Sequence, residues 1–163
     1  MDKLWAPWRM KYISGAHKDE GCIFCTKPKE NNDRDNLILY RGKHAFVMMN
    51  LFPYNNGHLM VAPYKHTGNI EDLDDNELLD MMHLVQKSIK AIKKCMRPDG
   101  FNTGFNIGRA AGAGIEAHVH FHIVPRWVGD TNFMPTLAGT KVISEHILDT
   151  YDKIYKEIHL EDI

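Results

Sequence analysis

The sequence predicts an α+β fold built on an antiparallel sheet, and its hydrophobic pattern gives the reasons. Short apolar segments come mostly in neighbouring pairs, one long amphipathic segment stands between the pairs, and a second lies near the C-terminus. A strict alternation of strand and helix would instead favour a doubly wound parallel sheet. The observed order indicates strands that pair with their neighbours beside a long helix.

The predicted strands are short apolar runs bounded by turn-forming residues. They are residues 37–40, 45–49, 58–62, 101–107 and 117–125. Residues 41–44 have the composition of a turn between the first two runs, and residues 53–57 form a break before the third.

Residues 74–96 form the clearest predicted helix. Its apolar residues alternate spacings of four and three, which places them on one stripe. They are Leu78, Met82, Val85, Ile89, Ile92 and Met96. Asp74 can cap this helix with Glu77 three residues on, and the Pro-Asp-Gly at residues 98–100 ends it.

A second amphipathic helix is predicted near the C-terminus. Its stripe consists of Ile143, Ile147, Tyr151, Ile154 and Ile158. A chain of 163 residues suits a single domain, since domains cluster at about 100–150 residues. Within it we expect an N-terminal arm over residues 1–20, a core over 22–126 and a C-terminal extension with the second helix over 127–163.

The bulk composition argues against several classes of function. The chain has 20 basic and 21 acidic residues and a formal net charge of -1, so we expect no nucleic-acid partner held by a basic face. No apolar run reaches the roughly 18 residues of a membrane span, and the first residues lack the apolar stretch of a secretory signal. Three cysteines leave one unpaired in any disulfide scheme, and a cytoplasmic location with reduced thiols is the simpler interpretation.

Histidines alternate with apolar residues between positions 116 and 126. Side chains on a strand point to opposite faces with a period of two. One face then carries Ala117, Val119, Phe121 and Ile123. The other face carries Glu116, His118, His120 and His122. The apolar face has an obvious partner in the core, so we expect the histidine face to line a polar cleft.

Three interpretations of the histidine face are open. It can be a solvated surface that is rich in histidine, or a metal-binding strand, since imidazoles are the commonest metal ligands. It can also carry out nucleophilic catalysis at phosphorus, in which an imidazole attacks and forms a covalent intermediate. That chemistry needs a neighbour that fixes the tautomer of the attacking ring and another imidazole that donates to a phosphoryl oxygen.

The run from His118 to Arg126, His-Val-His-Phe-His-Ile-Val-Pro-Arg, resembles the signature of the histidine triad (HIT) superfamily of nucleotide hydrolases and transferases. Residues 46–50 and 57–66 resemble the first conserved block of that family, so the resemblance covers about residues 22–126. It implies a HIT-like α+β fold with a mainly five-stranded antiparallel sheet. It also implies a homodimer that pairs the long helices.

The resemblance implies roles for four histidines. The middle histidine of the triad, His120, is the nucleophile and forms a nucleotidyl-histidine intermediate. His122 contacts phosphate oxygens, His118 orients the cluster or binds metal, and His58 joins the cluster. Asn50 occupies a position that binds ribose.

Further substrate contacts follow from the same resemblance. Asn106 and the loop over residues 108–114 are expected to lie along the α-phosphate and ribose. Many relatives carry Gly-Gln-Ser or Gly-Gln-Thr just before the triad, whereas this chain has Gly112 and Gly114 in the stretch Gly-Ala-Gly-Ile.

Residues 125–133 and 4–10 resemble the branch of diadenosine tetraphosphate phosphorylases or hydrolases. In that branch Arg126 is expected to meet distal phosphates, and Trp127 to stack on a base or wall off the site. A surface ion pair and simple packing are the alternatives for these two residues.

Cys22 and Cys25 have the spacing of a metal knuckle. A redox pair and two free buried thiols are the alternatives. In relatives with this motif the other ligands come from the positions of His66 and His118. The resemblance thus implies a closed, structural zinc site of Cys22, Cys25, His66 and His118, with no open position to activate water.

The leading hypothesis is an enzyme that attacks the α-phosphate of adenine nucleotides or dinucleotides, with a diadenosine polyphosphate as substrate. Water as the acceptor makes it a hydrolase, and phosphate makes it a phosphorylase. The distal phosphates can arrive with Mg²⁺. The alternatives are an adenosine phosphoramidate hydrolase, a non-catalytic nucleotide sensor, and a metallohydrolase with zinc held by the triad itself.

Overall fold

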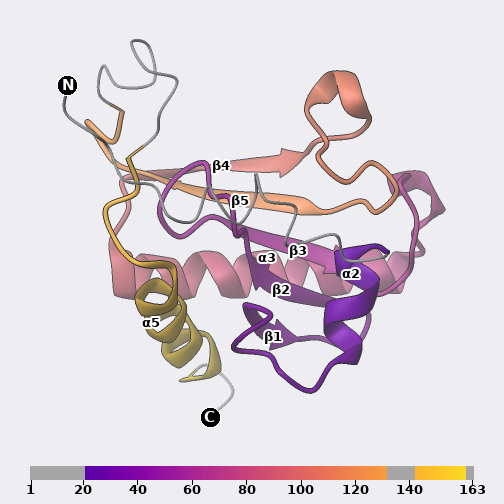
Figure 1. Cartoon of the computed structure of the whole chain (residues 1–163), viewed down its shortest axis with the longest axis horizontal. Coiled ribbons are helices and arrows are strands. Elements are labelled where there is room, and N and C mark those ends of the chain that lie inside the picture. Colours follow the sequence, from indigo (N-terminus) through magenta and orange to yellow (C-terminus); the bar gives the residue numbers. More distant parts are fainter. Residues whose placement is uncertain (1–20, 132–141, 161–163) are drawn as a thin grey trace.

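The computed structural model describes residues 21–131 and 142–160, and its strands form one antiparallel sheet (Figure 1). The strand order is β1-β2-β3-β5-β4. The strands are β1 (Ile38–Arg41), β2 (Ala45–Met49), β3 (Leu59–Pro63), β4 (Gly100–Phe105) and β5 (Phe121–Arg126). The α-helices are α2 (Ile23–Thr26), α3 (Asp75–Met96) and α5 (Ile147–Leu160). Short 3-10 turns are η1 (Lys27–Lys29), η2 (Ile70–Asp72) and η3 (Arg109–Ala111).

These elements confirm the predicted α+β class and the antiparallel sheet. The predicted N-terminal arm at residues 1–20 lies outside the described residues, as do residues 132–141 and 161–163 of the predicted C-terminal extension. None of the helices in the described ranges is long and apolar enough to cross a membrane.

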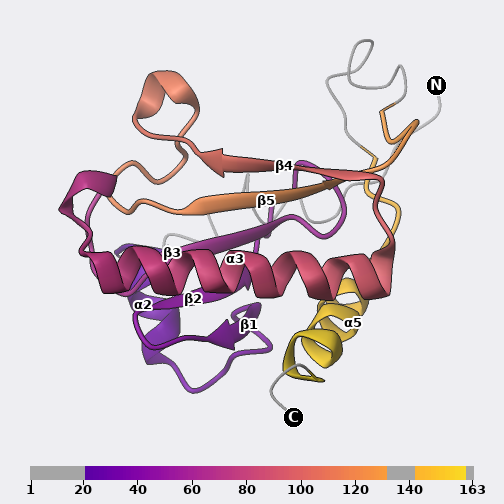
Figure 2. The ribbon, with the colours of Figure 1, turned by 180° about the vertical axis from the view of Figure 1, so that it is seen from behind.

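Helix α3 covers one face of the sheet (Figure 2). Because strand side chains alternate between faces, alternate residues such as Val47, Val61 and Ile123 join Val85 and Ile92 of α3 in one buried cluster. The C-terminal helix enters the same cluster. Its Ile154 and Ile158 are fully buried, and the hydroxyl of Tyr151 donates to the carbonyl of Ile38 at 2.8 Å.

The opposite face of the sheet has a smaller apolar cluster under α2. Phe24 is buried there against Phe46, Met48 and Met60. This face continues from β3 onto β5, where its inward positions carry the histidines. The sheet therefore separates an apolar core on one side from a histidine cluster on the other.

Helix α3 begins as predicted. The side chain of Asp74 accepts from the backbone N–H of Glu77, and the backbone N–H of Asp74 donates to the carboxylate of Glu77. The predicted apolar stripe was wrong in part, because Met82 is 41% exposed. The face that packs on the sheet instead includes Met81 and Leu84, which are buried.

Strand β5 is shorter than predicted, since its ladder begins at Phe121 opposite Val61 rather than at residue 117. The continued register would place Val119 opposite Pro63, which has no N–H to donate. The backbone N–H of Val119 donates instead to the carbonyl of Thr67 at 2.7 Å. His118 and His120 thus precede the ladder, and the carbonyl of Pro63 becomes available to a side chain.

Candidate active site

Four histidine side chains converge on the face of the sheet opposite α3. His58 lies just before β3, and the other three lie within or just before β5. His58 and His118 are fully buried, while His120 and His122 are 5% and 8% exposed. The rings of His120 and His122 are 4.8 Å apart between centroids, and those of His58 and His122 are 5.1 Å apart.

The tautomer of His120 is fixed by the backbone. Its Nδ1 lies 2.8 Å from the carbonyl oxygen of His118. A carbonyl only accepts, so Nδ1 carries the hydrogen and Nε2 carries the lone pair. Burial lowers the pKa of His120, against the smaller opposing effect of this hydrogen bond. A neutral imidazole with its lone pair on Nε2 is the form that can act as a nucleophile.

A second chain of hydrogen bonds fixes the tautomer of His122. The backbone N–H of Tyr54 donates to Nδ1 of His58 at 3.1 Å. Because a backbone N–H only donates, Nε2 of His58 must carry the ring hydrogen, and it donates to Nδ1 of His122 at 2.9 Å. Nε2 of His122 is left with a hydrogen that can be donated to a substrate oxygen.

Burial keeps these two rings neutral. It lowers the pKa of His58 to about 3, with a further contribution from His122. It lowers the pKa of His122 to about 4, with a further contribution from His120. The side-chain amide of Asn106 lies 3.4 Å from Nε2 of His122. The atom that faces this nitrogen is Nδ2 of the amide, so the amide's nitrogen and oxygen must exchange places before Asn106 can accept the hydrogen on Nε2.

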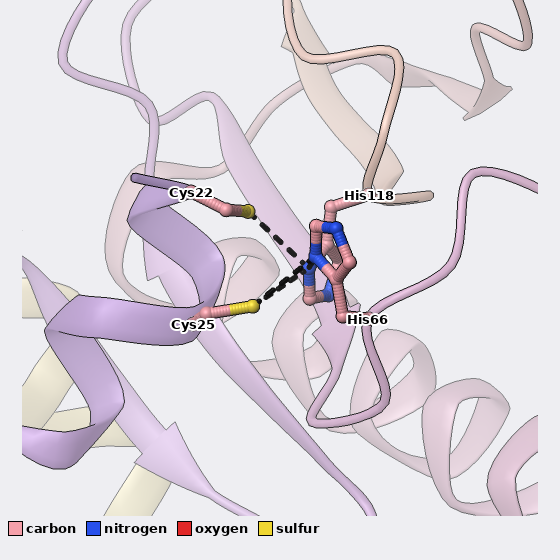
Figure 3. Close-up of side chains that lie close together, drawn as sticks. All are labelled: Cys22, Cys25, His66 and His118. Atoms are coloured by element: carbon pink, nitrogen blue, oxygen red, sulfur yellow. Dashed lines mark hydrogen bonds between the residues drawn. The ribbon is translucent and has the colours of Figure 1, made fainter. Parts of the chain in front are cut away.

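A second cluster joins Cys22 and Cys25 of the α2 segment to His66 and His118 (Figure 3). One ligand atom from each residue lies within 4.8 Å of the others. The two sulfurs lie 3.4 Å and 3.5 Å from Nδ1 of His118, and Cys25 lies 3.2 Å from Nδ1 of His66. Residues far apart in the sequence thus present four soft or borderline ligands to one point.

These distances fit the edges of a zinc tetrahedron. Bonds of about 2.3 Å to sulfur and about 2.0–2.1 Å to nitrogen place two nitrogens about 3.3 Å apart, and a nitrogen and a sulfur about 3.6 Å apart. The Nδ1 atoms of His66 and His118 are 3.3 Å apart. Nε2 of His118 donates to the carbonyl of Pro63 at 2.8 Å, which leaves the lone pair on Nδ1 for a metal.

Two residues predicted to meet the substrate have other partners. The guanidinium of Arg126 makes a two-point ion pair with Asp130 at 2.7 Å and 3.0 Å. The surface ion pair given above as the alternative is thus formed, and the contact of Arg126 with distal phosphates stays a prediction. Trp127 is half-buried, and its backbone N–H donates to Asp130 at 3.1 Å.

The remaining predicted contacts are Asn50 and the two glycines before the triad. The side-chain oxygen of Asn50 accepts from the backbone N–H of Phe52 at 2.9 Å. The backbone N–H of Asn50 donates to the carbonyl of His58. Gly112 and Gly114 are exposed in the loop beyond the end of β4 (Figure 1).

Two neighbours of the histidines were missing from the sequence-based prediction. The ring of Phe24 lies 4.7 Å from that of His120, and the ring of Tyr54 lies 4.7 Å from that of His58. Phe24 could have been inferred from its place inside the Cys-x-x-Cys motif. Nothing in the sequence signals the role of Tyr54, because its hydrogen bond comes from the backbone.

The sequence and the fold both match known proteins. The sequence profile of the HIT domain matches residues 31–128. The chain is 40% identical over 157 residues to the AP-4-A phosphorylase of Mycobacterium tuberculosis, an alignment that covers 92% of this chain and 80% of that protein. It is 30% identical over 116 residues to the adenosine 5'-monophosphoramidase of Saccharomyces cerevisiae, covering 71% and 69% of the two chains.

Solved structures agree with these relatives. A hypothetical histidine triad nucleotide-binding protein from Sulfolobus tokodaii superposes with a TM-score of 0.66 at 26% identity, covering 85% of this chain and 93% of that one. A Zn-bound histidine triad family protein from Mycobacterium smegmatis gives 0.68 at 21% identity, covering 88% and 96%, and so shares the fold. The chain belongs to the HIT domain family, the histidine triad proteins.

Proposed function

We propose that this chain is a nucleotide hydrolase or nucleotidyltransferase that attacks the α-phosphate of a diadenosine polyphosphate with Nε2 of His120. The observation that carries the proposal is the hydrogen bond from Nδ1 of His120 to the carbonyl of His118, which leaves the lone pair on Nε2 of a buried, neutral ring. The 40% identity to the M. tuberculosis AP-4-A phosphorylase supports the substrate class.

The reaction proceeds in two displacements at phosphorus. Nε2 of His120 forms a bond to the α-phosphorus, and the bond from that phosphorus to its bridging oxygen breaks with its electron pair on the leaving polyphosphate. The resulting nucleotidyl-histidine is attacked by an oxygen of water or phosphate. His120 then departs with its electron pair, and the nucleoside monophosphate or diphosphate is released.

The neighbours of His120 stabilise the charge that develops on the phosphoryl oxygens. Nε2–H of His122 is a donor fixed in place by His58, and preorganised donors of this kind are among the largest contributions to catalysis. Asn106 lies beside His122, and Asn50 lies beside His58, where it can meet a ribose hydroxyl. Magnesium can accompany the distal phosphates.

We also propose that Cys22, Cys25, His66 and His118 hold a structural zinc ion. The support is the tetrahedral spacing of the ligand atoms and the tautomer of His118. When bound, zinc would cross-link the α2 segment to the start of the histidine run. Four protein ligands leave no open position for water.

Product analysis tests the proposed activity. The purified chain is incubated with diadenosine tetraphosphate, with and without inorganic phosphate, and the nucleotides are separated by chromatography. Release of ADP that depends on phosphate identifies a phosphorylase, and release of AMP with ATP identifies a hydrolase. Absence of turnover under both conditions refutes the proposed substrate class.

An adenosine phosphoramidate hydrolase is the second candidate. It is favoured by the 30% identity to the yeast adenosine 5'-monophosphoramidase. The same histidines would serve, with an amine as the leaving group. Turnover of adenosine 5'-phosphoramidate at a much higher kcat/KM than diadenosine tetraphosphate would favour this candidate.

The partner and location are proposed on two further observations. Leu79 and Met82 of α3 are 56% and 41% exposed, and β4 lies at an edge of the sheet, so these elements offer a surface for a homodimer. Light scattering on the purified chain tests the dimer. Cys22, Cys25 and Cys95 form no disulfide, which supports a cytoplasmic location.

A further inference from the structure

A cavity of about 300 Å³ lies beside the catalytic histidines, at the end of the histidine face formed by β4 and β5. It is lined by Tyr54, Asn55, Asn102, Val124, Arg126 and Thr131. Ligand sites in proteins occupy about 300–1,000 Å³. This cavity is therefore large enough for one small ligand group, and it is separate from the nucleophile.

The strand residues of the cavity and those beside His122 lie on one face of the sheet. Directly opposed residues of an antiparallel pair point to the same face, and Gly104 opposes His122 while Asn102 opposes Val124. A side chain built on Gly104 would meet no atom within 4 Å. Glycine inside a strand commonly marks the close approach of a ligand. His122, Gly104 and Asn102 therefore share one face, with open space over Gly104 between the other two.

Tyr54 lines the cavity and also contacts the histidines. Its ring lies 4.7 Å from that of His58 and 5.9 Å from that of His122, stacked on the latter. Even so, the residue is 53% exposed. An exposed ring held on one side by other rings is a suitable surface for a nucleobase, because every base can stack on an aromatic side chain.

The charges around the cavity favour an uncharged ligand. Arg126 is the cationic residue in its lining, and its guanidinium is neutralised by the two-point ion pair with Asp130. The same guanidinium donates to Oδ1 of Asn102 at 2.7 Å. The Nδ2 group of Asn102 remains as a donor for a ring nitrogen or hydroxyl. A nucleoside suits these contacts better than a chain of phosphates does.

The distance between the cavity and His120 limits which leaving groups can reach the cavity. Val124 is four residues beyond His120, which is about 13 Å along an extended chain at ~3.3 Å per residue. An amine or a single phosphate bonded to the α-phosphorus is too short to reach the cavity. A second nucleoside at the far end of a polyphosphate chain is long enough.

We propose that this cavity is a subsite for the second nucleoside of a dinucleoside polyphosphate, with the base stacked on Tyr54 and hydrogen-bonded to Asn102. The inference rests on the proposed function and adds the structural basis for a preference for dinucleotides over mononucleotides.

Binding of two matched ligands tests the subsite. Diadenosine tetraphosphate and adenosine 5'-tetraphosphate share a tetraphosphate chain and differ by one nucleoside. Their affinities are measured by calorimetry on the full chain carrying His120→Asn, which prevents turnover. We expect the dinucleotide to bind about tenfold more tightly, and we expect Tyr54→Ala and Asn102→Ala each to remove most of that preference while leaving tetraphosphate binding unchanged.

Two controls separate stacking from general damage. Tyr54→Phe keeps the ring and should keep the preference, and Tyr155→Ala removes an equally large exposed residue from α5 and should change neither affinity. Equal binding of the two ligands to the parent chain, or a parallel loss for both ligands in the Tyr54 and Asn102 variants, overturns the subsite. Turnover by the unmodified chain tests the proposed function separately, since a chain that cleaves the dinucleotide without preferring it retains the function and loses the subsite.

Discussion

Substitution of His58 tests whether this residue controls the tautomer of His122. His58 is fully buried, accepts from the backbone of Tyr54 and donates to His122. His58→Leu removes both hydrogen bonds. His58→Asn can replace the acceptor for Tyr54 but is too short to reach His122. His58→Gln places an amide N–H near the position of the lost Nε2–H.

The expected decrease in kcat follows from the hydrogen-bond donor that His122 would lose. Without His58, Nδ1 of His122 can carry the hydrogen, and Nε2 then no longer donates to a phosphoryl oxygen. Loss of one preorganised donor to a developing charge costs roughly 10²–10³ in kcat. Because His122 would still sample the productive tautomer for part of the time, we expect a decrease of about 10²-fold for the Leu and Asn variants. The Gln variant should stay within about tenfold of the unmodified chain.

The assay is steady-state cleavage of diadenosine tetraphosphate, with thermal unfolding measured on each variant. Two-bond 1H–15N correlations of His122 report its tautomer directly, and they should show Nε2–H in the unmodified and Gln proteins. Equal kcat values for the Asn and Gln variants would refute the reasoning, as would an unchanged His122 tautomer in the Leu variant. A loss that merely followed stability would appear in the unfolding temperatures.

Four further predictions concern the nucleophile, the metal, the pH dependence and the C-terminal helix. His120→Asn should lower kcat by about 10⁴-fold or more while nucleotide affinity stays within a few-fold, and turnover by this variant would exclude His120 as the nucleophile. Cys25→Ser should reduce the zinc content from one ion per chain and lower the unfolding temperature by about 10 °C or more, whereas unchanged metal analysis would contradict the Cys2His2 site. Burial lowers the pKa of His58 to about 3, whereas an unfolded histidine titrates near pH 6.5, so the unfolded chain takes up this proton first as the pH falls. The decrease in unfolding free energy between about pH 7.5 and pH 5 should therefore be about 2 kcal/mol smaller in His58→Gln than in the unmodified chain, as urea titrations can measure. Ile154→Ala should cost about 2–5 kcal/mol in a single unfolding transition, since this residue is fully buried in the cluster it shares with α3; a separate early transition of α5 would show that the helix is not part of the core.

Local patterns in the sequence predicted those features that depend on local geometry. Asp74 and Glu77 form the expected capping box, because that motif needs only residues three apart. The alternation along residues 118–123 places the histidines opposite Val119 and Ile123, because side chains of extended backbone alternate even where no ladder forms.

Features that depend on distant partners were harder to predict. Helix α3 carries two overlapping apolar stripes, and only the position of the sheet decides that Met81 is buried while Met82 is exposed. The start of β5 depends on the missing N–H of Pro63, which lies on another strand. The ion pair between Arg126 and Asp130 forms across a turn whose geometry the sequence does not reveal.

His118 serves the two clusters through chemically independent atoms. Its imidazole belongs to the Cys2His2 set, whereas only its carbonyl oxygen holds the ring of His120. Every amino acid has that carbonyl. A lineage that dispensed with the metal could therefore replace the first histidine of the triad without losing the acceptor for the nucleophile, whereas His120 has no such freedom.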